Sequence, residues 1–128
     1  YVVGQTIWIA LREGHSVWKL DLRRGQLKHV AGSGKAGFVD GDADQAQFNG
    51  PKGIVVDAAG NAYVVDTENH AIRRVDGRTG EVSTIAGNGR VGSGSEGLSR
   101  PHGICFGPDE TLFVGDTLNH RVVQIALQ

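Results

Sequence analysis

Residues 51–70 read PKGIVVDAAGNAYVVDTENH, and both ends of this stretch return later in the chain. Its beginning, Pro51-Lys52-Gly53-Ile54, aligns with Pro101-His102-Gly103-Ile104, and its end, Asp66-Thr67-Glu68-Asn69-His70, aligns with Asp116-Thr117-Leu118-Asn119-His120. Both pairs have an offset of 50 residues (51 to 101, 66 to 116). A fixed offset of this size is typical of a protein built from repeated structural units.

A third, partial copy precedes these two. Residues 15–21 match residues 70–76, and residues 30–34 match residues 85–89, both at an offset of 55 (15 to 70, 30 to 85). The difference between the two offsets places about five extra residues in one loop between repeats. The chain of 128 residues therefore holds a little under three repeats.

The repeat has the pattern of a four-stranded antiparallel sheet. Short apolar, β-branched runs alternate with turns that carry Gly or Asn. No segment between them has the length and 3.6-residue period of a crossover helix, which excludes a parallel sheet. Four-stranded units repeating about every 40–55 residues predict an all-β fold, the β-propeller. In the middle copy the predicted strands are residues 53–57, 62–66, 71–76 and 81–86.

The copies at the two ends are incomplete. The first has three clear strands, with residues 1–3 as the stub of an innermost strand, and the last stops after three. We therefore predict a partial β-propeller of about three four-stranded antiparallel blades, half of a six-bladed ring. The outer copies have predicted strands at residues 7–11, 17–21, 26–31, 103–106, 111–116 and 121–126. The predicted units are a partial blade 1–34, a linker 35–50, a full blade 51–89, a linker 90–100 and a partial blade 101–128.

Three blades in a row predict an unfinished surface. A blade is stable because its neighbours cover both of its apolar faces, and a row of three leaves two outer faces and two sheet edges uncovered. Either the segment belongs to a longer propeller, or copies associate to close the ring. Two chains would supply about six blades, so we expect a homodimer.

The repeated residues resemble the NHL-repeat family, whose six-bladed propellers carry Pro-x-Gly-Ile, a hairpin, and then Tyr-Val-x-Asp-x-x-Asn-His-x-Ile. The first copy departs from this motif, with Leu11 and Gly14 in place of Asp and Asn. Residues 31–48 also resemble NHL proteins whose propeller follows a thioredoxin-like domain, although this chain has no Cys-x-x-Cys. The motif residues of the two full copies are Pro51, Gly53, Ile54, Gly60, Asn61, Tyr63, Val64, Asp66, Asn69, His70 and Ile72, then Pro101, Gly103, Ile104, Phe113, Val114, Asp116, Asn119, His120 and Val122.

Lys52 and His102 are the candidate ligand-binding residues. Both stand in a Pro-x-Gly turn before an innermost strand, and in a propeller such turns converge on the mouth of the central channel. The favoured function is a binding scaffold that presents these loops to a protein or small ligand. In propeller lyases related to the family, histidines near the channel act as metal ligands or bases, so a lyase or hydrolase using His102, with or without a divalent metal, is the alternative. One histidine is not a zinc site, and we predict no catalytic residue, metal or cofactor.

The triplets Asp66, Asn69, His70 and Asp116, Asn119, His120 are predicted to be structural. An Asp near a His can orient a general base, but a single active site needs one such constellation rather than one per blade. At the end of a hairpin, Asp and Asn side chains cap the turn backbone, and His can reach a neighbouring strand.

Charge and composition argue against other partners. The net charge is −1, and there are four Phe, two Tyr and two Trp, which is weak support for nucleic-acid binding. No run of 18 apolar residues is present, so no membrane partner is expected. The lone Cys105, in an innermost strand, is predicted to be buried. Gly-x-Gly-x-x-Gly motifs begin at Gly32 and Gly87, but each recurs at the blade offset and predicts a turn between blades rather than a nucleotide site.

Overall fold

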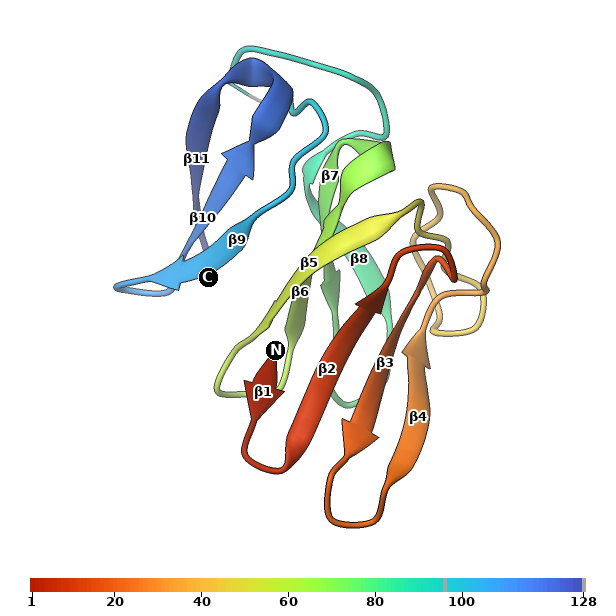
Figure 1. Cartoon of the computed structure of the whole chain (residues 1–128). Helices are drawn as coiled ribbons and strands as arrows, with labels where there is room; N and C mark the ends of the chain where they lie inside the picture. The colour runs from red at the N-terminus through yellow and green to blue at the C-terminus, as the bar shows by residue number, and fades with distance from the viewer. Residues whose placement is uncertain (96, 128) are drawn as a thin grey trace.

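The computed structural model describes residues 1–95 and 97–127, which form three antiparallel β-sheets side by side (Figure 1). Each sheet is a meander in which consecutive strands are neighbours. The all-β fold of three propeller blades is therefore confirmed, and the strands begin and end within one or two residues of their predicted limits. Within the described residues, no helix is long and apolar enough to span a membrane.

The first two blades have four strands each, and the third has three among the described residues. Blade 1 consists of β1 (Val2–Val3), β2 (Thr6–Leu11), β3 (Ser16–Asp21) and β4 (Gln26–Ala31). Blade 2 consists of β5 (Pro51–Val56), β6 (Ala62–Asp66), β7 (Ala71–Val75) and β8 (Val82–Gly87), with the single-turn 3-10 helix η1 (Thr67–Asn69) between β6 and β7. Blade 3 consists of β9 (Ile104–Gly107), β10 (Thr111–Asp116) and β11 (Arg121–Ala126), with η2 (Thr117–Asn119) between the last two.

At each junction between blades, a row of apolar side chains on the later blade packs against the blade before it. The row of blade 2 lies across its four strands, is 0–5% exposed, and contacts Trp8, Val17 and Ala31 of blade 1. Burying one such valine contributes about 1.5–3 kcal/mol relative to leaving it in water. The blade 2 row is Val56, Ala62, Val75 and Val82, and the corresponding residues of blade 3, Phe106, Leu112 and Ile125, pack against blade 2.

Blade 1 has the same row, but no other blade among the described residues packs on it. Val2, Ile7, Leu20 and Leu27 lie opposite one another in register, at the positions that the covered row occupies in blade 2. Val2 is 63% exposed and Leu27 is 59% exposed. The described chain therefore presents at its first blade the kind of surface that it buries between its other blades.

The far face of blade 3 is open as well, and it corrects the prediction for Cys105. On blade 2 the corresponding face carries Val55 and Tyr63, which are buried against blade 3. Fifty residues later, Cys105 and Phe113 form a cross-strand pair on the open face, and Cys105 is exposed. Cys105 was expected in the core because the sequence pattern marks a strand residue as apolar without showing whether a following blade covers it.

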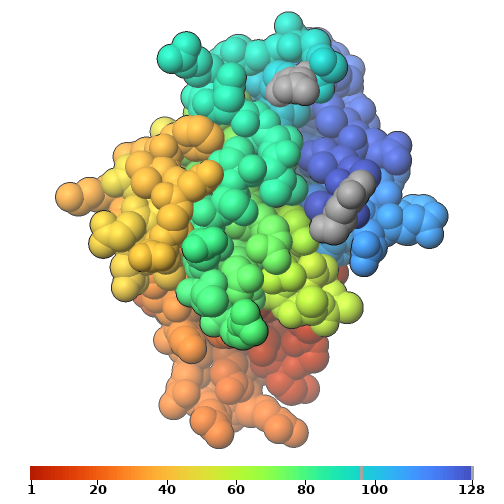
Figure 2. Space-filling model, turned by 180° about the vertical axis from the view of Figure 1, so that it is seen from behind, coloured from red at the N-terminus to blue at the C-terminus, as the bar shows by residue number. Residues whose placement is uncertain are grey.

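The connector between blades 1 and 2 folds back against the outside of blade 2. Gly41 exchanges two backbone hydrogen bonds with Val82, at 3.0 and 2.8 Å, so the connector adds a short bridge to the edge of β8. Figure 2, viewed from behind, shows this segment in yellow to orange beside the green β8. The connector thereby covers the outer part of β7 and β8.

Candidate functional site

The start of β5, which contains Lys52, and the segment that leads into β9, which contains His102, lie at the upper end of the molecule in Figure 1. Lys52 is the second residue of β5, and His102 comes two residues before β9. Pro51 pairs with Asp66, which places this end of β5 beside the turn that contains η1. Lys52 is exposed and His102 is half-buried.

A carboxylate held by two arginines stands beside them. Glu68, in η1, accepts a hydrogen bond at 3.0 Å from Arg12 of the β2–β3 turn and another from Arg100, two residues before His102. Arg12 also donates to the carbonyl of Gly50 at 3.1 Å. Burial raises the pKa of Glu68, but the hydrogen bond from Arg12 and the charges of both arginines outweigh burial and lower it. We call Arg12, Lys52, Glu68, Arg100 and His102 the upper-end cluster.

The surroundings of His102 lower the pKa of its imidazole, although the charge of Glu68 opposes this shift. Burial lowers the pKa of His102, and the charges of Lys52, Arg100 and Arg12 lower it further. Its Nε2 is buried and has no hydrogen-bond partner among the described residues. Residues 1–95 and 97–127 contain no group of three or more His, Cys, Asp and Glu side chains placed to hold a metal ion. The chemistry of the cluster is therefore that of cations around one ion-paired carboxylate.

The triplet Asp66, Asn69 and His70 ties the turn of blade 2 to the connectors on both sides. Asp66 accepts the N–H of Asn49 at 2.8 Å and the side-chain amide of Asn69 at 2.8 Å. Asn69 also donates to the carbonyl of Gly37 at 2.7 Å. These contacts differ from the expected capping, because the side chains bind the preceding connector rather than their own turn backbone; no side-chain cap closes η1.

The histidine of each turn points the other way, toward the next blade. His70 has a left-handed φ of 52°, and its Nδ1 accepts the N–H of Arg100 at 3.0 Å. His15, with φ 47°, accepts the N–H of Gly50 at 3.1 Å. His120 has the same φ of 52°, but its ring has no hydrogen-bond partner among the described residues, which include no blade after it. The turns of blades 1 and 2 thus end in a histidine acceptor directed at the start of the following blade.

The second triplet repeats the geometry of the first. Asp116 accepts the N–H of Ser99 at 2.7 Å, and Asn119 donates to Asp116 and to the carbonyl of Gly92, both at 2.8 Å. Burial raises the pKa of Asp116, but the Ser99 N–H, Asn119 and Arg121 outweigh burial and lower it.

Arg73 is a structural residue whose role the motif does not reveal. Its side chain is fully buried, pairs with Asp66 at 2.7 Å and with Asp40 at 2.8 Å, and donates to the carbonyls of Gln47 and Val39. Its guanidinium lies 4.8 Å and 5.1 Å from the ring centres of two phenylalanines, Phe38 and Phe48. The connector that holds Asp40 thus contributes a counter-ion and an aromatic cover.

Arg121 performs the same task in blade 3 from another position. It donates to Asp116 at 2.8 Å and to the carbonyl of Gly97, which stands 50 residues after Gln47. At that offset, however, Arg121 corresponds to Ala71, two residues before Arg73. Residues two apart in a strand face the same side of a sheet, so both arginines reach the equivalent carboxylate.

A hollow lies at the opposite, lower end. It is a groove of about 660 Å³ between the β5–β6 and β9–β10 hairpins. Tyr63 donates a hydrogen bond to Asp57 at 3.1 Å in its wall, and the rings of Tyr63 and Phe106 meet edge to face at 6.1 Å. Arg74 and Glu110 supply charges of opposite sign. Sequence reasoning missed this groove, because its lining comes from hairpins whose spacing no motif encodes.

Comparison with known proteins points to one family. The model of the NHL repeat matches residues 48–75 and 98–125. The chain is 37% identical over 106 residues to Protein SUPPRESSOR OF QUENCHING 1, chloroplastic, of Arabidopsis thaliana, covering 75% of this chain and 10% of the relative. It is 32% identical over 130 residues to NHL repeat-containing protein 2 of Gallus gallus, covering 90% of this chain and 18% of the relative. The chain therefore spans less than a fifth of either relative.

Solved structures agree on the fold. A protein of unknown function from Bacteroides thetaiotaomicron superposes with a TM-score of 0.84 at 25% identity, covering 96% of this chain and 32% of that one. An auxiliary nutrient binding protein from the same organism superposes with a TM-score of 0.76 at 27% identity, covering 94% of this chain and 34% of that one. With its repeats, its blades and these relatives, the chain belongs to the NHL-repeat β-propeller family.

Proposed function

We propose that this chain is a binding scaffold whose ligand, a protein or a small molecule, sits at the upper end of the inner strands against Lys52 and His102. The proposal rests on the hydrogen bonds that fix the turns at that end in place. Each turn there is hydrogen-bonded to the connectors before and after it, and loops held in this way lose little conformational entropy when a ligand binds. The structural relative named as a nutrient binding protein is consistent with a binding role for such a propeller.

The enzymatic alternative finds less support in the same geometry. A general base must bring its free nitrogen within hydrogen-bond reach of the substrate. Nε2 of His102 is buried, and we infer that the ring supports the site rather than reacting with a substrate.

Titration of isotope-labelled protein with a panel of small probes tests the position of the site. With acetate, phosphate, glycerol and benzyl alcohol as probes, we expect at least one to shift the backbone amide signals of Lys52, Gly53, His102 and Gly103 in a saturable way. The amides of Ala58 and Gly107, in the lower groove, serve as the internal comparison. Saturable shifts confined to the lower groove, or none at the upper end with any probe, would contradict the proposal.

We further propose that two copies close a six-bladed ring. In such a ring the uncovered row of blade 1 (Val2, Ile7, Leu20 and Leu27) packs on the face of blade 3 that carries Cys105 and Phe113 in the other copy. Consecutive blades pack in the same way within the chain. The units 1–34, 51–89 and 101–128, joined by the linkers 35–50 and 90–100, would be its blades. Leu27 on one surface and Val122 on the other are 59% and 69% exposed, so closure would remove a large apolar area from water at both junctions.

Light scattering across a dilution series tests the closure. We expect a mass of twice 13.6 kDa and a slow reaction of Cys105 with a thiol reagent, because Cys105 lies on the surface to be covered. Leu27→Arg should halve the mass and expose the thiol. Leu22→Arg is the matched control, since Leu22 is 47% exposed but stands in the turn after β3, outside the row. A folded monomer with a rapidly reacting thiol before any substitution would refute closure by a second copy.

A further inference from the structure

The upper-end cluster carries an excess of positive charge in a chain whose net charge is −1. It contains three permanent cations, Arg12, Lys52 and Arg100. Two carboxylates accompany them: Glu68 between the arginines, and Glu13, whose side chain is 92% exposed and lies 3.8 Å from Arg12. Among the described residues, no carboxylate is within ion-pair distance of Lys52. Local charge of one sign at the edge of a rigid surface attracts ligands of the opposite sign.

The contacts of Glu68 show which chemical group these arginines accept. Each of its two oxygens is taken by a different arginine, one from blade 1 and one from the connector before blade 3. The planar guanidinium group has five N–H donors, and Arg12 uses only some of them, on Glu68 and on the carbonyl of Gly50. Donors therefore remain available for the oxygens of a second anion beside Glu68.

The lower groove offers no comparable attraction. Its lining contains one arginine, Arg74, against two carboxylates, Asp57 and Glu110. The amino group of Tyr1, which donates to the carbonyl of Trp8, also lines this groove. The charges of the groove therefore balance, whereas the upper end keeps an excess of positive charge.

We propose that the upper-end cluster binds an oxyanion of its ligand, a phosphate or carboxylate group, through Lys52, Arg12 and Arg100, with Glu68 as the internal group that competes for the two arginines. This inference rests on the scaffold function proposed above and names the chemical class of its ligand.

Calorimetric titration with pyrophosphate and with the tricarboxylate citrate tests the proposal and distinguishes the two sources of the oxyanion, with glycerol as the uncharged probe. We expect binding of at least one anion and none of glycerol, and an affinity that falls as sodium chloride rises from 50 to 300 mM, values chosen to shorten the screening length. Lys52→Gln should weaken binding about two- to five-fold, the range expected for one exposed ion pair.

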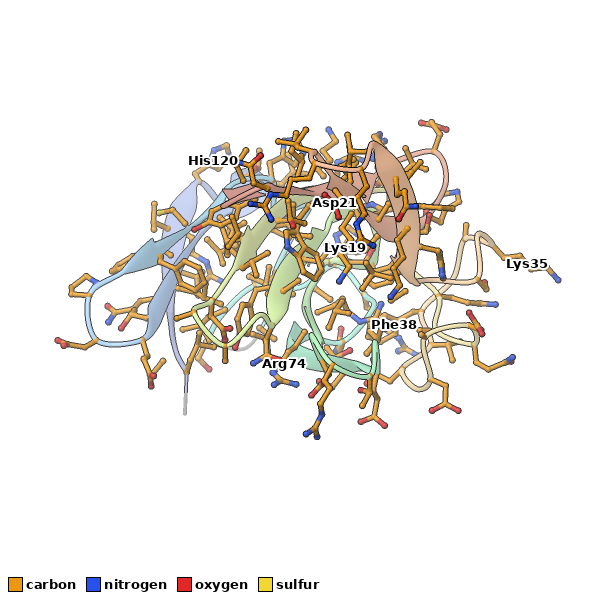
Figure 3. The ribbon with its side chains drawn as sticks, turned by 90° about the horizontal axis from the view of Figure 1, so that it is seen from below. Lys19, Asp21, Lys35, Phe38, Arg74 and His120 are labelled. Carbon is orange, nitrogen blue, oxygen red and sulfur yellow. The ribbon has the colours of Figure 1, made fainter. Side chains whose placement is uncertain are left out.

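Two matched pairs of variants distinguish anion binding at the upper-end cluster from non-specific attraction of anions to the whole protein. Lys35→Gln removes the same charge from a connector residue whose side chain projects away from the sheets (Figure 3), and it should leave the affinity unchanged. Glu68→Gln should tighten anion binding about two- to five-fold by releasing both arginines, whereas Glu81→Gln, on an exposed turn, should not.

Three results would overturn the proposal: equal effects of Lys52→Gln and Lys35→Gln, no gain in Glu68→Gln, or stronger binding of glycerol than of either anion. The last result, with shifts at the upper end, would still support the scaffold function. If no probe shifts the amide signals at the upper end, the result would instead contradict the scaffold function itself.

Discussion

Replacing Arg73 with methionine is expected to lower the free energy of unfolding by about 3–5 kcal/mol, because the change leaves the carboxylate of Asp66 buried without its cation. Asp66 is fully buried at 2.7 Å from Arg73, and burial raises the pKa of Asp66 even beside this cation. Without Arg73 the protein must either bury an unsolvated charge or protonate the carboxylate, and both cost stability. The guanidinium also fastens the connector through Asp40 and two backbone carbonyls. Urea denaturation followed by circular dichroism at one fixed protein concentration measures the effect.

Arg74 provides the control for this experiment. It is the next residue of the same strand and faces the other side, where its side chain is 33% exposed and its nearest carboxylate, Asp76, lies 3.8 Å away. Arg74→Met should cost no more than about 1 kcal/mol. If Arg73→Met abolishes folding, the double variant Arg73→Met/Asp66→Asn should recover part of the stability, because the buried charge is gone. Equal effects of the two arginine substitutions would disprove the structural role of Arg73.

Gly87→Ala is expected to destabilise the protein by about 2–5 kcal/mol, as the sum of two effects. Gly87 has a φ of +81°, which costs an L residue about 1–2 kcal/mol. A Cβ at this position would also stand 2.1 Å from the carbonyl oxygen of His70 and 2.8 Å from Cα of Ala71. These are backbone atoms that cannot rotate away, and such overpacking costs a further 1–3 kcal/mol or so.

Gly60→Ala separates the two contributions. Gly60 has a similar φ of +91°, but a Cβ there would meet nothing within 4 Å, so it should cost only the conformational part, about 1–2 kcal/mol. Thermal denaturation of both variants measures the difference. An equally small effect at Gly87 would mean that the close approach between β8 and the turn of blade 2 is not needed for stability.

These two sites illustrate what the sequence could and could not reveal. The glycines at 32 and 87 were interpreted as turns between blades, because they recur at the blade offset. Both have a positive φ, 106° and 81°, and each stands where a strand ends, Gly32 directly after β4 and Gly87 as the last residue of β8. The strands could be predicted because turn residues separate short β-branched runs. The alternation of a strand also places Arg73 and Arg74 on opposite faces. It does not show that Arg73 is buried, because its partner Asp40 stands 33 residues earlier in a connector.

The site was harder to predict than the fold, because its contacts also join residues that lie far apart in the sequence. Lys52 and His102 could be placed at one end from their position near the start of the inner strands, although Lys52 lies within β5 and not in a turn before it as predicted. Their neighbours Arg12, Glu68 and Arg100 come from three separate turns, and no motif relates Arg12 to Glu68, 56 residues away. Contacts of this kind depend on how blades stack, which a pattern within one repeat does not encode.

The histidines that end each turn give the molecule a direction. Blade 2 offers the acceptor nitrogen of His70 on one side and, through the N–H of Gly50 before it, donates to His15 on the other, so the two surfaces of this blade are not interchangeable. Blades can therefore be joined head to tail but not face to face in mirror fashion. Any assembly that satisfies His120 must continue in the same sense, and whether it ends as a ring or grows into a filament depends only on the curvature added at each junction.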